Sequence, residues 1–301
     1  MKHKNLINKI LTLCIAATLT VSAFAVTASA AEGDMKISLG ADLNESQEAE
    51  VFRLLDIDSV EPSNVIYVTN EEEHQYLDQY VSADKIGTEA LSSSKIILKG
   101  EGYGIKVTTY NINYCTVGMY QSALATAGVK NADVYVAGPD KISGTAALVG
   151  VMKAYSTASD GILNEENVEA ATQELAVTSS LGESINEPEK AEQIIAELKK
   201  ELSSIDGMDD ATLDQNIRDI ANELGVSLTD EQVASIRELL RKLGSLDIDW
   251  DSVWSQLKGL YEKYTGSGAD LGNVQNIFNK IGNFFSGIFD KIGSFFSEIF
   301  G

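Results

Sequence analysis

Few residues of this chain could supply a nucleophile and its base. Beyond residue 30, Cys115 is the one cysteine and His74 the one histidine. A reactive thiolate needs an adjacent base, so these two residues form the one Cys–His pair open to the chain. No neighbouring motif supports that pair, and a cysteine between a strand and a helix is typically a small apolar residue. A lone cysteine also predicts no intrachain disulfide and no disulfide-linked partner.

Three other motifs suggest a ligand site, but their spacing or chemistry favours a structural role. Gly100, Gly102 and Gly104 do not form the glycine pattern of a dinucleotide site. The segment 143–145, Ser-Gly-Thr, opens a predicted helix whose amino end could bind an anion, and we expect Ser143 there as an ordinary N-cap. The alternating carboxylates of 247–251 lack the glycine and glutamate of a calcium loop. We therefore predict no metal ion, no cofactor and no assignable catalytic residue.

The C-terminal segment is the most unusual part of the sequence. An eleven-residue unit beginning at Ile277 recurs from Ile288, and a third copy begins at Ile299. Eleven residues make three helical turns plus about 20°, so the apolar positions share one helix face. These positions are the predicted docking residues: Ile277, Phe278, Ile281, Phe284, Phe285, Ile288, Phe289, Ile292, Phe295, Phe296, Ile299 and Phe300.

Such a face needs a cover, because burying each Ile or Phe is worth about 1.5–3 kcal/mol. Three surfaces could bury this apolar face: the protein's own helices, a membrane interface, or a second copy of the chain. Lys280 and Lys291 balance Asp290 and Glu298, so apolar burial would drive membrane binding rather than attraction to anionic lipid.

Charge and composition limit the partners. The 301 residues include 23 Lys and Arg against 45 Asp and Glu, a net charge of −22. Three of the lysines and none of the acids precede residue 31, so the remainder carries 20 basic against 45 acidic residues, or −25. This charge repels phosphate backbones and excludes nucleic acid as an expected partner.

The first thirty residues have the three parts of a secretory signal. Lys2, Lys4 and Lys9 precede an uncharged apolar stretch, and 28–30 is an Ala-Ser-Ala cleavage pattern. A retained membrane anchor is the alternative. We expect the protein to be secreted or extracellular and peripherally associated with the cell envelope.

Any functional site must be positioned by strands and helices, and their predicted pattern changes along the chain. Strands are predicted at 35–39, 65–69, 94–98, 105–110 and 133–137, with helices between them. Asn44 and Gln47 form a capping box, and Asn70 is expected to cap the next helix. The glycines 100–104 suggest a hairpin that joins the third and fourth strands. After Asn164 helices are predicted at 164–176, 187–204, 209–224, 229–243 and 249–264.

The predicted fold class is α+β or α/β. We expect a signal peptide (1–30), an N-terminal domain with a mixed sheet and helices (31–170) and an all-helical domain (171–266). A Phe/Ile-rich amphipathic terminal helix (272–301) ends the chain.

Several segments together resemble a known family. They are Leu-Gly-Ala-Asp-Leu (39–43), Val-Thr-Asn-Glu-Glu-Glu-His (68–74), Ala-Leu-Ala-Thr-Ala-Gly-Val (123–129), Ser-Gly-Thr-Ala-Ala-Leu (143–148), Met-Lys-Ala-Tyr (152–155) and Leu-Asp-Ile-Asp-Trp (246–250). In these segments the chain resembles the YpuA-like secreted proteins of Gram-positive bacteria, domain-of-unknown-function family 1002, over about residues 33–262. The resemblance implies an extracellular protein but supplies no catalytic residues.

We therefore expect a non-catalytic extracellular or envelope-associated binding protein whose terminal helix docks on a membrane, a partner or itself. The alternative is an extracellular hydrolase that acts on envelope or glycan material through an unrecognised carboxylate site.

Overall fold

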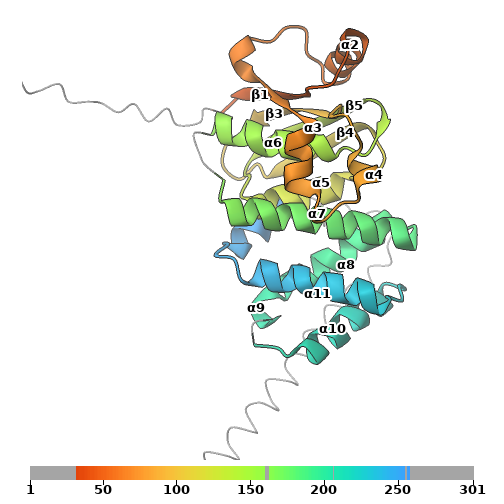
Figure 1. The fold of residues 1–301 in the computed structure, drawn as a ribbon. Coiled ribbons are helices and arrows are strands. Elements are labelled where there is room, and N and C mark those ends of the chain that lie inside the picture. The colour runs from red at the N-terminus through yellow and green to blue at the C-terminus, as the bar shows by residue number, and fades with distance from the viewer. Residues whose placement is uncertain (1–31, 160–162, 206, 255, 258–301) are drawn as a thin grey trace, which may run out of the picture.

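The computed structural model describes residues 32–159, 163–205, 207–254 and 256–257 (Figure 1). The fold class is α+β, as predicted. Five strands form one sheet in the order β2-β1-β3-β5-β4. Their bounds lie within a few residues of the predicted ones, except that β5 continues further: β1 Met35–Gly40, β2 Val65–Val68, β3 Ser93–Leu98, β4 Ile105–Ile112 and β5 Ala132–Ile142.

The strand order contradicts one prediction. β3 and β4 follow each other in the chain, but β5 lies between them, parallel to β4 and antiparallel to β3. The glycines 100–104 therefore belong to a connection across β5 and not to a hairpin. The glycine cluster predicts a turn but carries no information on which strand will fill the gap.

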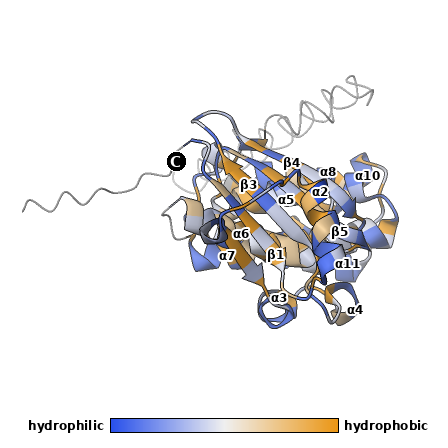
Figure 2. Ribbon diagram, turned by 90° about the horizontal axis from the view of Figure 1, so that it is seen from above, coloured by the Kyte–Doolittle hydropathy of each residue, from blue (hydrophilic) through white to orange (hydrophobic). Residues whose placement is uncertain are grey.

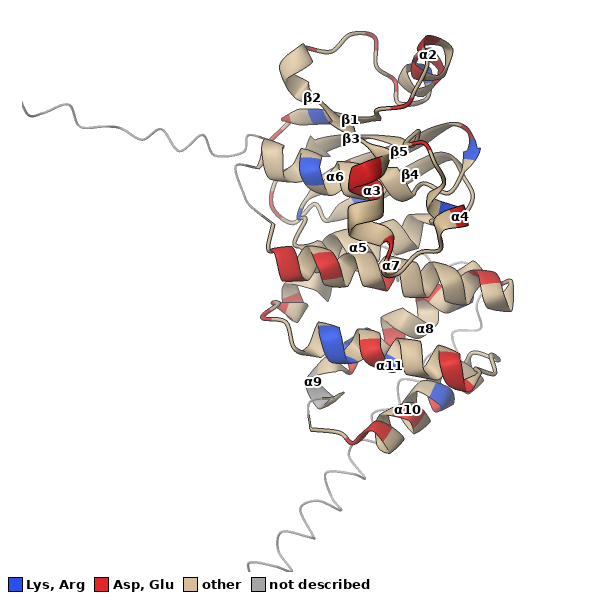
Figure 3. Cartoon of the chain, in the orientation of Figure 1, with Lys and Arg blue, Asp and Glu red and all other residues tan. Residues whose placement is uncertain are grey.

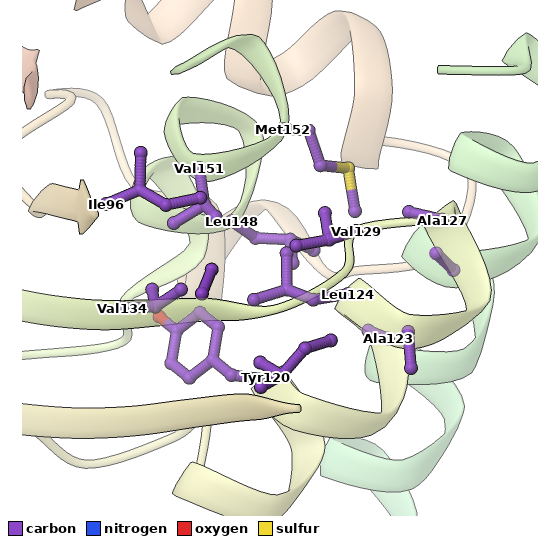
Figure 4. Close-up of a cluster of buried hydrophobic side chains, with 14 of the residues drawn as sticks. Ile96, Tyr120, Ala123, Leu124, Ala127, Val129, Val134, Leu148, Val151 and Met152 are labelled. Carbon is purple, nitrogen blue, oxygen red and sulfur yellow. The ribbon is translucent and has the colours of Figure 1, made fainter. Parts of the chain in front are cut away.

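Helices α5 (Val117–Ala127) and α6 (Thr145–Ala158) form the main core with the sheet. Tyr120 and Leu124 from α5 meet Leu148 and Val151 from α6 and Val134 from β5 (Figure 4). Each of these side chains is at most 1% exposed. The two helices are apolar around most of their circumference because a further helical layer covers them.

The other face of the sheet is covered by α2 (Glu45–Leu54), which begins at the predicted capping box of Asn44 and Gln47. Val51 and Leu55 pack there with Ile37 and Leu39 of β1. A 3-10 turn, Pro62–Asn64, then leads into β2.

The helical layers lie on the side of α5 away from the sheet (Figure 1). They comprise α7 Glu165–Ile185, α8 Pro188–Lys200, α9 Leu202–Ile205, α10 Asp210–Glu223 and α11 Asp230–Gly244. Hydrophobic and hydrophilic segments alternate along α10, as expected for a helix with one packed face (Figure 2). Acidic residues are spread over α2, α3 (Asn70–Leu77), α7 and α10 (Figure 3).

Helix α7 continues nine residues beyond the predicted end at residue 176. Leu175 belongs to the core under the sheet and Leu181 to the core of the helical layers. Near the end of α7, an added Cβ at Gly182 would meet Pro188 Cα at 2.8 Å, so a glycine here lets α8 approach closely. The division into domains at 170 and 171 stays a prediction.

A polar cleft at the carboxyl edge of the sheet

Four strands end at the same edge of the sheet. β1 and β2 are parallel, β4 and β5 are parallel, and both pairs run antiparallel to β3. The segments that follow β2, β4 and β5 therefore meet the segment that leads into β3. A cleft of about 630 Å³ lies there. Ligands of open sheets commonly bind outside the carboxyl ends of the strands, so this cleft is the candidate site.

The walls of the polar cleft come from five places. One wall is α4 (Ala83–Ile86) with the loop 87–92, and a second wall is the end of α7 with Pro188. The remaining lining comes from α3 (Asn70–Leu77), from residues 113–114 after β4 and from residues 141–146, which span the end of β5 and the start of α6. Lys85 of α4 and Glu183 of α7 form an ion pair at 2.5 Å that joins the two walls.

Glu73 is a buried carboxyl among the lining residues, with 1% of its surface exposed. The Nδ2 of Asn70 lies 3.4 Å from its Oε2, and the Thr145 hydroxyl also hydrogen-bonds to the carboxyl. Burial raises the pKa of Glu73, and these hydrogen bonds offset that only in part. The side chain can therefore hold a proton at a pH where an exposed carboxyl has lost it.

His74 fixes one wall of the cleft instead of acting on a ligand. Its Nδ1 lies 2.6 Å from Oδ1 of Asp78, and its Nε2 lies 3.1 Å from the carbonyl oxygen of Gly87. The hydrogen bond to Asp78, followed by the one to Gly87, raises the pKa of the imidazole. Gly87 has φ +82°, a conformation that favours glycine, and this contact holds the turn at Gly87 against α3.

The Cys115–His74 alternative is not formed. Cys115 is 2% exposed and hydrogen-bonds to Tyr120 and Ser179 instead. Burial raises the pKa of its thiol to about 12, which is opposite to the shift that a nucleophilic cysteine needs.

Two predicted helix caps are displaced by one residue. The N-cap of α6 is Gly144 with φ +94° and not Ser143, whose Oγ instead lies 3.0 Å from Oγ1 of Thr145. An added Cβ at Gly144 would lie 2.5 Å from the Tyr120 hydroxyl, so the packing selects glycine there. The N-cap of α3 is Thr69 and not Asn70, and Glu72 completes its capping box.

The acidic motif 247–251 lies where a helical segment begins, at Trp250, within one residue of the helix start predicted at 249. Asp249 accepts a hydrogen bond from the Ser252 amide at 3.1 Å. Trp250 packs against both the sheet core and the helical core. Within the described residues, no group of three His, Cys, Asp or Glu side chains is placed to hold a metal ion.

All twelve predicted docking residues, Ile277 to Phe300, lie outside the described residues, and so do the signal segment 1–30 and the terminal helix 272–301. Their predicted roles stay predictions. Among the helices that the structure describes, none has the length and apolar character that a membrane crossing requires.

Comparison with known proteins decides the family. Residues 39–260 match the family model described as Protein of unknown function (DUF1002). The chain belongs to this family. It is 41% identical over 262 residues to the Uncharacterized protein YpuA of Bacillus subtilis (strain 168), an alignment that covers 86% of this chain and 88% of that protein. No solved structure gives a significant match.

In this DUF1002 member, sequence reasoning missed Glu73. An acidic run in the first turn of a helix, such as 71–73, is expected to complement the helix dipole, and this suits exposed Glu71. Glu73, however, shares a helix face with Leu77 four residues later, and both side chains are buried. That spacing is the signal that could have singled out the third glutamate of the run.

Proposed function

We propose that this DUF1002 protein is a secreted, envelope-associated binding protein that takes a polar ligand in the cleft. The observation that carries the proposal is the 630 Å³ cleft with a buried carboxyl in its lining. Its volume lies within the range of about 300–1,000 Å³ that is usual for small-molecule sites. Its lining contributes hydroxyl, amide, carboxylate and ammonium groups, such as those of Thr145, Asn113, Asp84 and Lys141.

A binding role is favoured over hydrolysis because the side chains best suited to proton transfer are already hydrogen-bonded or buried. Both ring nitrogens of His74 are hydrogen-bonded, and the Cys115 thiol is buried. The hydrolase alternative rests on Glu73 as a proton donor with a second carboxylate from Asp84, Glu89 or Glu183.

The proposed attachment to the envelope rests on the sequence. The basic and apolar residues before the Ala-Ser-Ala pattern support export, and the twelve Ile and Phe positions from Ile277 to Phe300 support docking of the terminal helix. The chain would then hold its ligand close to the membrane surface.

Truncation tests the attachment. A chain beginning at Ala31 is compared with one that ends at Gly268, by size-exclusion chromatography with light scattering, with and without phosphatidylcholine vesicles. We expect only the longer chain to bind vesicles. A further variant of the longer chain replaces apolar Phe284 and Phe285 by Ser. Its matched control replaces polar Asn279 and Asn283 by Ser. Equal behaviour of all four chains would refute docking through the apolar face.

A second assay separates binding from hydrolysis. The protein is incubated with purified Gram-positive cell wall, and new reducing ends and free amines are measured. We expect retention on the wall without release of either product. Release that disappears in a Glu73→Gln variant would favour the hydrolase.

A further inference from the structure

We propose that the polar cleft binds the ammonium group of a primary amine, with Glu73 as its counter-ion. This inference rests on the proposed binding function and names the chemical class of the ligand. It places the amine near one end of the cleft, against Glu73, Thr145 and Ser143, and leaves the remaining volume for the rest of the molecule.

A comparison of two buried glutamates carries the argument. Glu174 and Glu73 are each 1% exposed. The carboxyl of Glu174 has a full counter-ion, because Lys199 Nζ lies 2.7 Å from its Oε1. Within the part of the chain that the structure describes, no lysine or arginine lies within ion-pair distance of Glu73. His74 acts on the Glu73 carboxyl only at a distance, because its two ring nitrogens are bound to Asp78 and Gly87. Because buried charges in proteins are normally paired, Glu73 is the one of these two glutamates without a cation in direct contact.

The groups around Glu73 suit the shape of an ammonium ion. An ammonium donates three hydrogen bonds and accepts none. The carboxyl of Glu73 hydrogen-bonds to the Thr145 hydroxyl, and Thr145 Oγ1 lies 3.0 Å from Ser143 Oγ. All three side chains line the cleft. They offer one charged and two neutral acceptors, which matches the three donors.

The walls of the cleft add negative charge. Lys85 is neutralised by Glu183 at 2.5 Å. Of the other charged lining residues, Asp84 and Glu89 outnumber Lys141. The amino end of α6 beside Thr145 supplies only a partial positive charge, which helps Glu73 to ionise without replacing a counter-ion. A cation is therefore the ligand whose charge complements this cleft.

The cleft is larger than an ammonium ion alone requires. A volume of 630 Å³ holds a small organic molecule. Side chains with hydroxyl and amide groups, among them Thr88, Asn113 and Asn186, line the rest of the space. The ligand class is thus a primary amine that also carries hydroxyl or amide groups, such as an amino sugar or a short peptide with a free amine.

The test uses two sugars that differ at one nitrogen. The full chain is titrated at pH 6.5 with D-glucosamine, which carries an ammonium, and with N-acetyl-D-glucosamine, which carries an amide, by saturation-transfer NMR and calorimetry. We expect glucosamine to bind at least tenfold more tightly. Equal affinities would overturn the ammonium assignment while leaving a polar-ligand cleft, and hence the proposed function, in place.

Variants locate the site. Glu73→Gln keeps the shape of the side chain and should weaken glucosamine binding at least tenfold, whereas Glu71→Gln, at an exposed position in the same turn, should leave it unchanged. Ser143→Ala gives a second measurement should Glu73→Gln fail to fold, and we expect a loss of at least threefold. Absence of glucosamine binding to the folded full chain, or equal binding by Glu73→Gln, would overturn the inference. The vesicle assay is independent of both results.

Discussion

The Nζ of Lys199 lies 2.7 Å from Oε1 of Glu174, with side chains that are 0% and 2% exposed. Lys199 also donates to Ser122 Oγ and Thr126 Oγ1, each at 2.9 Å. Ser122 and Thr126 belong to α5, Glu174 to α7 and Lys199 to α8. A single ammonium therefore joins three helices between the sheet core and the helical core.

Removing one member of this pair should destabilise the protein strongly. Lys199→Met leaves Glu174 buried without its cation, and we expect a loss of about 3–5 kcal/mol in the free energy of unfolding. The double variant Lys199→Met with Glu174→Leu should lose less, because no charge stays buried. Urea unfolding of the four chains of this cycle measures the coupling. Additive losses would show that the two side chains act independently.

The His74 contact predicts a dependence of stability on pH. Its folded-state pKa is raised above 6.5, first by the hydrogen bond to Asp78 and then by the carbonyl of Gly87. A raised pKa stabilises the fold fully below the unfolded-state value, and the contribution disappears as pH rises through the folded-state value. Urea unfolding between pH 5.5 and 8.5 should show wild type losing its advantage over His74→Gln as pH rises. A constant difference would contradict this role.

Glu73 should weaken the ligand-free protein as pH rises. Burial raises its pKa above 4.5, so ionising the carboxyl costs folding free energy at neutral pH. Glu73→Gln should therefore be more stable than wild type at pH 7 and similar to it near pH 4. Thermal unfolding at the two pH values measures this. An unchanged difference in Tm between them would place the titration of Glu73 within its ordinary range.

Cys115 should report on opening of the core. Its thiol is 2% exposed, and burial raises its pKa to about 12. In a chain that begins at Ala31, a thiol reagent at pH 8 should label Cys115 slowly in buffer and rapidly in urea. Rapid labelling of the native protein would indicate that the region beneath the cleft is open to solvent.

Most elements of the fold could be predicted from local patterns. Strand β2 follows the mainly β-branched apolar run 65–68, and the capping box at Asn44 marks a helix start within one residue. The order of the strands could not be predicted, because the placement of β5 between β3 and β4 depends on contacts between distant segments. The extension of α7 depends in the same way on its packing against α5, α8 and α11.

The cleft was not predictable from any motif. Its lining brings together Glu73, Thr145 and Glu183, which lie far apart in the sequence and meet only when the sheet edge is built. The capping pattern at 143–145 did indicate a helix start. It could not show that Gly144 would be the cap or that Ser143 would be left beside Thr145.

Helix α7 has a consequence for how the protein unfolds. Its 21 residues lie between the core under the sheet and the core of the helical layers, and apolar side chains of the one helix belong to each. Neither core can lose α7 and keep its packing, so the loss of one removes a wall of the other. The sheet and the helical layers are thereby bound into a single cooperative unit, and a shortened chain that ends inside α7 would have neither core complete.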